Sequence, residues 1–207
     1  MKTRTLALAG TSIALTLLLA ACGSTAGTST DTSTPSGASA AVAQAAGEAT
    51  DADISFAQLM IPHHQQAVEM ADLALDRATS PEVKELAEQI KGAQDPEIEM
   101  MSGWLEAWGA PMQMDGADGM DHGGMDMGGM SVSGMMTDED MQALADASGM
   151  DFDQMWLKMM IAHHQGAISM AEQIKAESSN AEVTAVADAV ISGQTAEIDT
   201  MQQLLAQ

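Results

Sequence analysis

The chain carries an internal repeat, and this repeat constrains its fold more than any other feature. A shift of 100 positions aligns the two halves without a gap, over a stretch of about fifty residues that is typical of a duplicated structural unit. Identical pairs in this register include Asp53 and Asp153, Gln94 and Gln194, Glu97 and Glu197, Met101 and Met201, and Leu105 and Leu205. The fold must therefore contain two copies of one unit.

The first segment of each unit is predicted to be a helix. Apolar residues recur at helical spacing from Phe56 to Met70, and the pattern continues to about Ala78. Pro62 falls inside this segment, where a proline removes one backbone hydrogen bond and costs about 3 kcal/mol. The equivalent residue of the second unit is Ala162, and alanine is a strong helix former, so we expect a kinked but continuous helix.

The second segment of each unit also reads as a helix. Ser80 and Pro81 form a typical start, because serine caps the first turn and proline fits the first helical position. We expect this helix to continue through Pro96 to about Trp108, and Asn180 is the equivalent cap in the second unit. Each unit is thus a predicted helical hairpin.

Two helical hairpins bury their apolar faces most simply as a four-helix bundle. An all-α fold also suits the composition, since aromatic residues make up 2% of the chain and tyrosine is absent, whereas strands draw on aromatic residues. A short additional helix is expected from about Asp138 to Ala147, with Thr137 as its cap.

Residues 110–136, which join the two units, are rich in methionine and glycine. We expect a mobile loop here, and eight of the chain's 20 methionines lie in it. Thioether sulfur is a soft ligand that selects Cu(I), and imidazole also suits copper. The candidate ligands of this predicted capture site are Met120, His122, Met125, Met127 and Met130. The alternative is that the methionines fill a groove on the bundle as adaptable packing.

Paired histidines lie near the middle of the first helix in each unit. On an ideal helix, Met60, His63 and Met70 share one face, while His64 is rotated from His63 by about 100°. One ring of each pair can therefore point inward while the other points toward an adjacent helix or solvent. The predicted metal ligands are Met60, His63, His64 and Met70, with Met160, His163, His164 and Met170. The alternative is a set of hydrogen-bonded core histidines.

The second helices offer further candidate ligands. Glu97 and Met101 are one helical turn apart, and the pair is repeated at Glu197 and Met201. The alternative is an exposed glutamate beside a core methionine. Two glutamines that follow the histidine pairs are expected either to hydrogen-bond a ligand imidazole or to be solvated, and these are Gln65 and Gln165.

The N-terminal residues resemble a bacterial secretion signal. Lys2 and Arg4 precede an apolar stretch that is too short to span a membrane. Leu-Ala-Ala-Cys ends this stretch at Cys22 and resembles a lipoprotein cleavage box. We therefore expect removal of residues 1–21 and lipid attachment at Cys22. The alternative is an ordinary cleaved signal that leaves a free thiol.

The remaining domain organisation follows from composition. Residues 22–50 are dominated by small and polar residues, which favour a flexible tether from Cys22, with a partly helical arm as the alternative. The predicted bundle occupies residues 51–207 and comprises repeat 1 at 51–109, the loop at 110–136, and the short helix with repeat 2 at 137–207.

The charge of the chain excludes one class of partner. It has 30 acidic and 7 basic residues, which gives a formal charge of -23, so the phosphate backbone of a nucleic acid would be repelled. The single cysteine excludes intramolecular disulfides and multi-cysteine metal sites. Histidine, methionine and carboxylate side chains are left as metal ligands.

The paired-histidine segments resemble a known family. MIPHHQQAVEMA at 60–71 and MIAHHQGAISMA at 160–171 are similar to the signature of the bacterial domain of unknown function 305 family. The resemblance covers the chain from about residue 51 to the C terminus and implies a ferritin-like four-helix bundle in the cell envelope. It also implies copper binding, as in some family members, by the motif methionines and histidines. The methionine-rich loop is not part of the family motif.

Ligand chemistry favours copper over iron. Di-iron bundles use Glu-x-x-His pairs, whereas Met60 and Met160 stand three residues before His63 and His163. The sequence therefore predicts a lipid-anchored, extracytoplasmic protein that binds copper as Cu(I) for sequestration or transfer and is not an enzyme. The alternatives are a ferritin-like metal oxidase and a metal-free helical protein-interaction module. Envelope copper-handling proteins and a second copy of the chain are further partners that the sequence leaves open.

Overall fold

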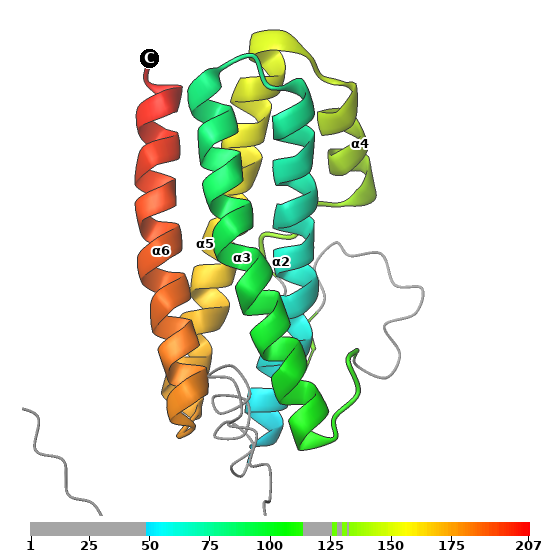
Figure 1. Ribbon diagram of the computed structural model, residues 1–207, viewed down its shortest axis with the longest axis vertical. Coiled ribbons are helices and arrows are strands. Elements are labelled where there is room, and N and C mark those ends of the chain that lie inside the picture. The colour runs from blue at the N-terminus through cyan, green and yellow to red at the C-terminus, as the bar shows by residue number, and fades with distance from the viewer. Residues whose placement is uncertain (1–48, 114–125, 128–129, 132) are drawn as a thin grey trace, which may run out of the picture. The chain divides into compact units, whose positions relative to one another are not determined.

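The computed structural model describes residues 49–113, 126–127, 130–131 and 133–207. These residues form a helical bundle (Figure 1) and one small β-ribbon. The four long helices are α2 (Asp51–Arg77), α3 (Pro81–Trp108), α5 (Gly149–Glu177) and α6 (Ala181–Leu205). The remaining elements are the short helix α4 (Asp138–Asp146) and the strands β1 (Asp126–Met127) and β2 (Met130–Ser131). The predicted all-α class is confirmed.

Side-chain caps mark the start of three of the four long helices, α2, α3 and α6, whereas α5 begins without one. Thr50 and Asp53 form a capping box at the start of α2, and the Ser80 side chain accepts a hydrogen bond from the Val83 amide at the start of α3. The Asn180 side chain caps α6 in the same way. Each such cap stabilises its helix by about 1 kcal/mol, and the predicted caps at Ser80 and Asn180 are confirmed.

Two other local predictions are also confirmed. The short helix α4 begins after Thr137, whose side chain forms a capping box with Asp140, and α4 packs against α5. Helices α2 and α3 continue through Pro62 and Pro96. Neither proline therefore breaks its helix.

The two hairpins pack together through their first helices. Helix α2 packs along α3, α5 packs along α6, and α2 also packs against α5, whereas α3 and α6 contact each other less. The N-terminal half of α2 shares a cluster of buried residues with the C-terminal half of α5, so these two helices run in opposite directions. The sequence repeat thus appears in space as two related hairpins (Figure 1).

Polar groups also join the repeats. The buried Trp156 ring donates its N–H to the Met70 carbonyl oxygen at 2.8 Å, and a buried indole N–H usually finds such an acceptor. The Asp153 carboxylate accepts hydrogen bonds from the backbone amides of Thr79 and Ser80 at 2.9 and 3.0 Å. These contacts fix α5 against α2 and against the turn that follows it.

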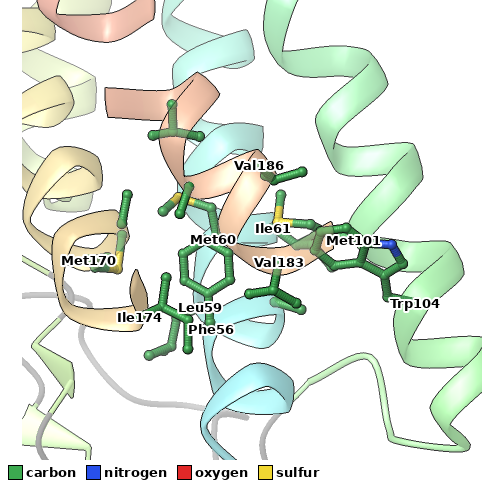
Figure 2. Packing of buried hydrophobic residues seen from close by; sticks show 14 of the residues in the cluster. Phe56, Leu59, Met60, Ile61, Met101, Trp104, Met170, Ile174, Val183 and Val186 are labelled. Atoms are coloured by element: carbon green, nitrogen blue, oxygen red, sulfur yellow. The ribbon is translucent and has the colours of Figure 1, made fainter. Parts of the chain in front are cut away.

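Two clusters of buried apolar residues form the core. The first includes Phe56 and Trp104 from repeat 1 and Ile174 from repeat 2 (Figure 2). The second includes Ile90 from repeat 1 and Trp156 from repeat 2. A fully buried side chain of this size stabilises the fold by about 1.5–3 kcal/mol, so both clusters hold the two repeats together.

A layer of polar residues, here called the histidine layer, lies between the two clusters. On α2, the histidine pair follows Ile61 of the first cluster and precedes Met70 of the second. The same alternation occurs on the other long helices. The members of the histidine layer are His63, His64, Gln94, Glu97, His163, His164, Gln194 and Glu197.

The N-terminal predictions fall outside the described residues. The predicted signal peptide at 1–21, the predicted lipidation site Cys22 and the predicted tether up to residue 48 belong to the part of the chain that is not described. Within the described part, no helix is both long enough and apolar enough to cross a bilayer.

Candidate metal centre

His63 and His163 meet in the core of the bundle, where α2 packs against α5. Their ring centroids are 3.8 Å apart, with the ring planes tilted by 41°, and neither residue is exposed to solvent. No ring nitrogen of the pair forms a hydrogen bond of ordinary geometry with a described residue, although the backbone of Ser133 lies near the His63 ring. Unpaired buried polar groups cost about 1–3 kcal/mol each, so the pair destabilises the fold unless it binds a ligand.

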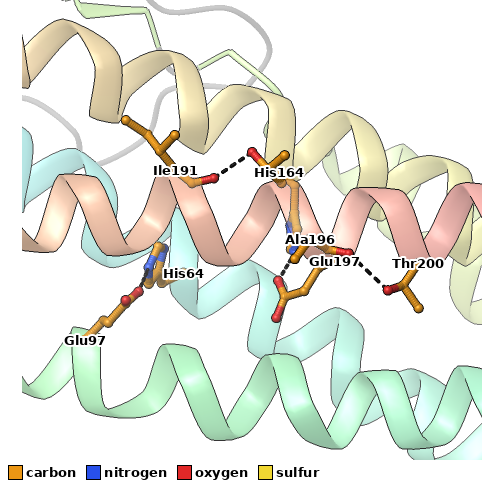
Figure 3. Close-up of polar contacts among 8 residues, drawn as sticks. His64, Glu97, His164, Ile191, Ala196, Glu197 and Thr200 are labelled. Carbon is orange, nitrogen blue, oxygen red and sulfur yellow. Dashed lines mark hydrogen bonds and ion pairs between the residues drawn. The ribbon is translucent and has the colours of Figure 1, made fainter.

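His64 and His164 point toward the second helix of their own repeat. Nε2 of His64 lies 2.7 Å from Oε2 of Glu97, and Nε2 of His164 lies 2.7 Å from Oε2 of Glu197 (Figure 3). When Nε2–H donates a hydrogen bond to the carboxylate, Nδ1 carries the lone pair that a metal ion needs. Both Nδ1 atoms are buried and lack a partner among the described residues. The glutamates, which the sequence suggested as ligands, are thus placed to orient the rings.

Burial keeps the two central histidines neutral. Desolvation and the nearby His64 lower the pKa of His63 to about 3, although the backbone of Ser133 acts in the opposite direction. Desolvation, followed by the charges of His63 and His164, holds the pKa of His163 well below its usual value. Both rings are therefore neutral at neutral pH. Neutral imidazole is the form that binds metal ions.

Three buried methionines, here called a methionine triad, flank the histidine layer on each side. Met60, Met101 and Met170 belong to the first apolar cluster (Figure 2). Their repeat equivalents in the second cluster are Met160, Met201 and Met70. All six are at most 2% exposed, and each triad draws on both repeats. Buried thioethers beside neutral imidazoles form a donor set suited to a soft monovalent ion.

Gln94 and Gln194 complete the layer and were not predicted as site residues. They are only 2% and 4% exposed, and neither amide forms a hydrogen bond with any described residue. The two glutamines occupy equivalent positions of the repeat, but a residue that is identical in both repeats need not be buried. Gln65 and Gln165 are exposed, in agreement with the alternative that these two are solvated.

The predicted capture loop is described only in part. Met120, His122 and Met125 lie outside the described residues. Met127 pairs with Met130 across the antiparallel ribbon of β1 and β2, an element that the sequence did not predict. Because β2 contacts α5, the ribbon lies beside the helix that carries the second histidine pair.

Two glycines allow the end of this loop to pack closely against α5. A Cβ added to Gly166 would lie 1.8 Å from the Ser133 carbonyl oxygen, and one added to Gly134 would lie 2.7 Å from the Ala162 carbonyl oxygen. Gly134 also has a φ of 89°, which glycine adopts without strain. The segment at Ser133 and Gly134 therefore lies directly against the part of α5 that carries His163.

Imidazole and carboxylate groups alone do not complete a metal site. Among the described residues, no group of three or more His, Cys, Asp or Glu side chains is arranged to hold an ion. An ion held in the histidine layer would therefore need thioether or amide groups as further ligands. The methionine triads and the two buried glutamines provide both.

Several solved structures are similar to this chain. A DUF305 protein from Streptomyces coelicolor, described as secreted, is 34% identical, with a TM-score of 0.67 over 75% of this chain and 91% of that chain. CopM in its Cu(I)-bound form is 34% identical, with a TM-score of 0.59 over 76% of this chain and 96% of that one. The Cu(II)-bound form of CopM gives 34% identity and a TM-score of 0.59, over 74% and 95% of the two chains. None of the curated proteins compared with the chain matches it.

The sequence profile of one family covers nearly all of the bundle. It is described as a domain of unknown function (DUF305) and matches residues 53–205. This range contains both histidine pairs and both methionine triads. The chain belongs to the DUF305 family.

Proposed function

We propose that the protein binds copper as Cu(I) at the histidine layer, with imidazole and thioether groups as ligands. The observation that carries this proposal is a set of four buried histidines with unpaired ring nitrogens between two buried methionine triads. The proposed ligands are His63, His64, His163 and His164, with Met60, Met70, Met101, Met160, Met170 and Met201. Glu97 and Glu197 act through the rings that they contact.

The similar structures support the choice of metal. CopM has been solved in Cu(I)-bound, Cu(II)-bound and silver-bound forms. Soft thioether ligands favour Cu(I) over hard cations, and the six buried methionines of this chain offer such ligands. The formal charge of -23 also attracts cations to the protein.

The proposed role is sequestration or transfer of copper, without catalysis. A di-iron oxidase of the ferritin-like kind uses four glutamates with two histidines. In the described part of this chain, the carboxylates that contact the four histidines are those of Glu97 and Glu197. A metal-free interaction module would leave the unpaired ring nitrogens in the core without an explanation.

We further propose that the methionine-rich loop is a labile capture site. Its ligands are Met120, His122, Met125, Met127 and Met130. Support comes from the sequence and from the two glycines that hold the end of the loop against α5. Copper bound by the loop would then lie near the bundle that receives it.

The proposed location is outside the cytoplasm, on a bacterial membrane. Removal of residues 1–21, lipid attachment at Cys22 and a tether over residues 22–50 would place the bundle there. The description of the Streptomyces coelicolor relative as secreted supports an extracytoplasmic location. A Cys22→Ser variant is expected to move from the membrane fraction to the soluble fraction, and retention at the membrane would contradict the lipid anchor.

Native mass spectrometry of the protein with Cu(I) under anaerobic conditions tests the proposed binding site. The parent is compared with a variant that lacks residues 111–136 and with one in which the four paired histidines are changed to alanine. We expect both variants to bind fewer copper ions than the parent, with the tightly held copper lost in the histidine variant. Equal copper binding by the parent and the histidine variant would contradict the proposal.

A further inference from the structure

The proposed Cu(I) site leaves two buried glutamines without a role. Twelve buried side-chain nitrogen and oxygen atoms of the described residues lack a hydrogen-bond partner, and ten of them belong to the histidine layer. Four of the ten are the amide atoms of Gln94 and Gln194. Native proteins contain few such atoms, so their concentration in one layer indicates that the amides meet a ligand there.

Helical spacing places Gln94 at the level of the histidines. On α3, Ile90 belongs to the second apolar cluster and Met101 to the first, so Gln94 lies between them. Glu97 contacts His64, and a residue three positions away shares its helix face. Gln94 therefore faces the same layer of the core as the glutamate that orients a histidine.

The sequence repeat gives Gln194 the equivalent place on α6. Val190 belongs to the first cluster and Met201 to the second, and Glu197 contacts His164. The two amides thus enter the layer from α3 and α6, the second helices of the two repeats. Each repeat contributes two imidazoles and one amide to the same layer.

The donor atoms of the histidine layer differ from those of the layers beside it. Imidazole nitrogen and amide oxygen suit Cu(II), which takes nitrogen and oxygen ligands in tetragonal geometry, whereas thioether sulfur selects Cu(I). An amide oxygen is also neutral, so it adds no buried charge to the core. The core therefore offers a nitrogen and oxygen donor set between two sulfur donor sets.

We propose that Gln94 and Gln194 make the histidine layer a binding site for divalent copper. Their amide oxygens and the layer imidazoles bind Cu(II), while the methionine triads and the same imidazoles bind the monovalent ion. This inference rests on the proposed function, because both oxidation states bind in the same part of the core. The glutamines determine which oxidation states the centre accepts, and they are not needed for the soft ion.

A paired substitution with a matched control tests this assignment. The Gln94→Leu/Gln194→Leu variant removes both amides at similar side-chain volume, and Gln58→Leu is the control. Gln58 is also buried, at 8% exposure, but its amide donates to the Pro111 carbonyl oxygen at 2.7 Å. Cu(II) binding is measured by competition and by electron paramagnetic resonance, and Ag(I) binding by calorimetry as a redox-inert probe of the sulfur ligands.

The expected result is a loss of affinity for Cu(II) alone. The double glutamine variant should bind Cu(II) about 10- to 100-fold more weakly, with a changed resonance spectrum and unchanged Ag(I) affinity, while Gln58→Leu matches the parent for both ions. If the leucine variant does not fold, Gln94→Asn/Gln194→Asn, which keeps the amides but withdraws the oxygens, must show the same selective loss.

Other outcomes overturn the inference. Parent-like Cu(II) affinity and an unchanged spectrum in the folded double variant would show that the amides do not serve Cu(II). A parent that binds Ag(I) but not Cu(II) also overturns it and leaves the proposed function standing. A parent that binds neither Ag(I) nor Cu(I) overturns the proposed function itself.

Discussion

Gln66 and Gly166 occupy the same position in the two repeats, and both hold the end of the loop that joins the repeats. The Gln66 amide donates to the Met136 carbonyl oxygen at 2.8 Å and accepts from the Met136 N–H at 2.7 Å. Gly166 lets the Ser133 carbonyl group approach α5 because it has no side chain. The loop end is therefore fixed to both α2 and α5, beside the histidine pairs.

A Gly166→Ala substitution should destabilise the protein. The added Cβ would lie 1.8 Å from the Ser133 carbonyl oxygen, which belongs to the backbone and cannot rotate away as a side chain would. Overpacking of this kind costs about 1–3 kcal/mol. The free energy of unfolding, measured by urea denaturation, should fall by that amount.

Gly193→Ala is the matched control for this substitution. Gly193 lies inside α6, and nothing lies within 4 Å of the position that its Cβ would take. Alanine at such a site stabilises a protein by about 0.4–1 kcal/mol, because it restricts the unfolded chain. Equal free energies of unfolding for the two alanine variants would contradict the close approach at Gly166.

Much of the fold was predictable because its signals are local. The caps at Ser80, Thr137 and Asn180 were identified from single residues next to apolar patterns, and each lies at the start of a helix. The repeat also decided that Pro62 and Pro96 do not end their helices. A cap or a helical period depends on residues a few positions apart, so the sequence alone reports it.

The parts of the site that were missed depend on contacts between distant residues. Gln65 follows the histidines in the sequence, but two positions along a helix correspond to a rotation of about 200° from His63, and Gln65 is exposed. Gln94 is buried only because α3 packs against the rest of the core. The close contact at Gly166 forms because the end of a loop about 30 residues earlier in the chain packs on α5.

The central histidines should make stability depend on pH. His63 has a usual pKa of 6.5 and a pKa of about 3 in the folded protein, so the unfolded state binds the proton first as the pH falls. The stability present above pH 6.5 is therefore lost progressively as the pH decreases toward 3. Each such histidine contributes a slope of about 1.4 kcal/mol per pH unit in this range.

Urea unfolding of the metal-free protein at several pH values between about 7 and 5 measures this slope. A His63→Leu/His163→Leu variant is the comparison, because it removes the two central rings and keeps every carboxylate. The variant should show a much smaller change in the free energy of unfolding over this range. Parallel pH profiles for the parent and the variant would argue against a neutral buried pair.

Replacing the orienting glutamates should weaken copper binding without removing a proposed ligand. In Glu97→Gln/Glu197→Gln, the negative charge that holds Nε2 of His64 and His164 is lost. Loss of a group that orients a ligand histidine typically weakens metal affinity about 10- to 100-fold. Competition with a chromophoric Cu(I) chelator measures the change.

The exposed Glu99 lies on the same helix as Glu97, which makes Glu99→Gln a control for the loss of one charge. This variant should keep the Cu(I) affinity of the parent, because Glu99 is exposed and the carboxylates that pair with His64 and His164 are those of Glu97 and Glu197. A similar loss of affinity in Glu99→Gln would mean that total charge, and not the orientation of the rings, controls binding.

A Met101→Leu/Met201→Leu variant should lose affinity for Cu(I) and Ag(I) while keeping its fold. Both residues are fully buried, and leucine has a similar volume, so each exchange costs less than about 1.5 kcal/mol of stability. Leucine has no sulfur, so one thioether disappears from each methionine triad. X-ray absorption of the Cu(I)-loaded protein should show fewer sulfur neighbours than in the parent.

Met100→Leu separates ligation from packing in this experiment. Met100 is adjacent to Met101 and packs at the edge of the first cluster, but it is only partly buried and its repeat equivalent is Thr200. A general effect of methionine content would lower metal affinity in this variant as well. If sulfur in the triads binds the ion, Met100→Leu keeps the parent's affinity and sulfur count, and only the paired Met101 and Met201 exchange reduces them.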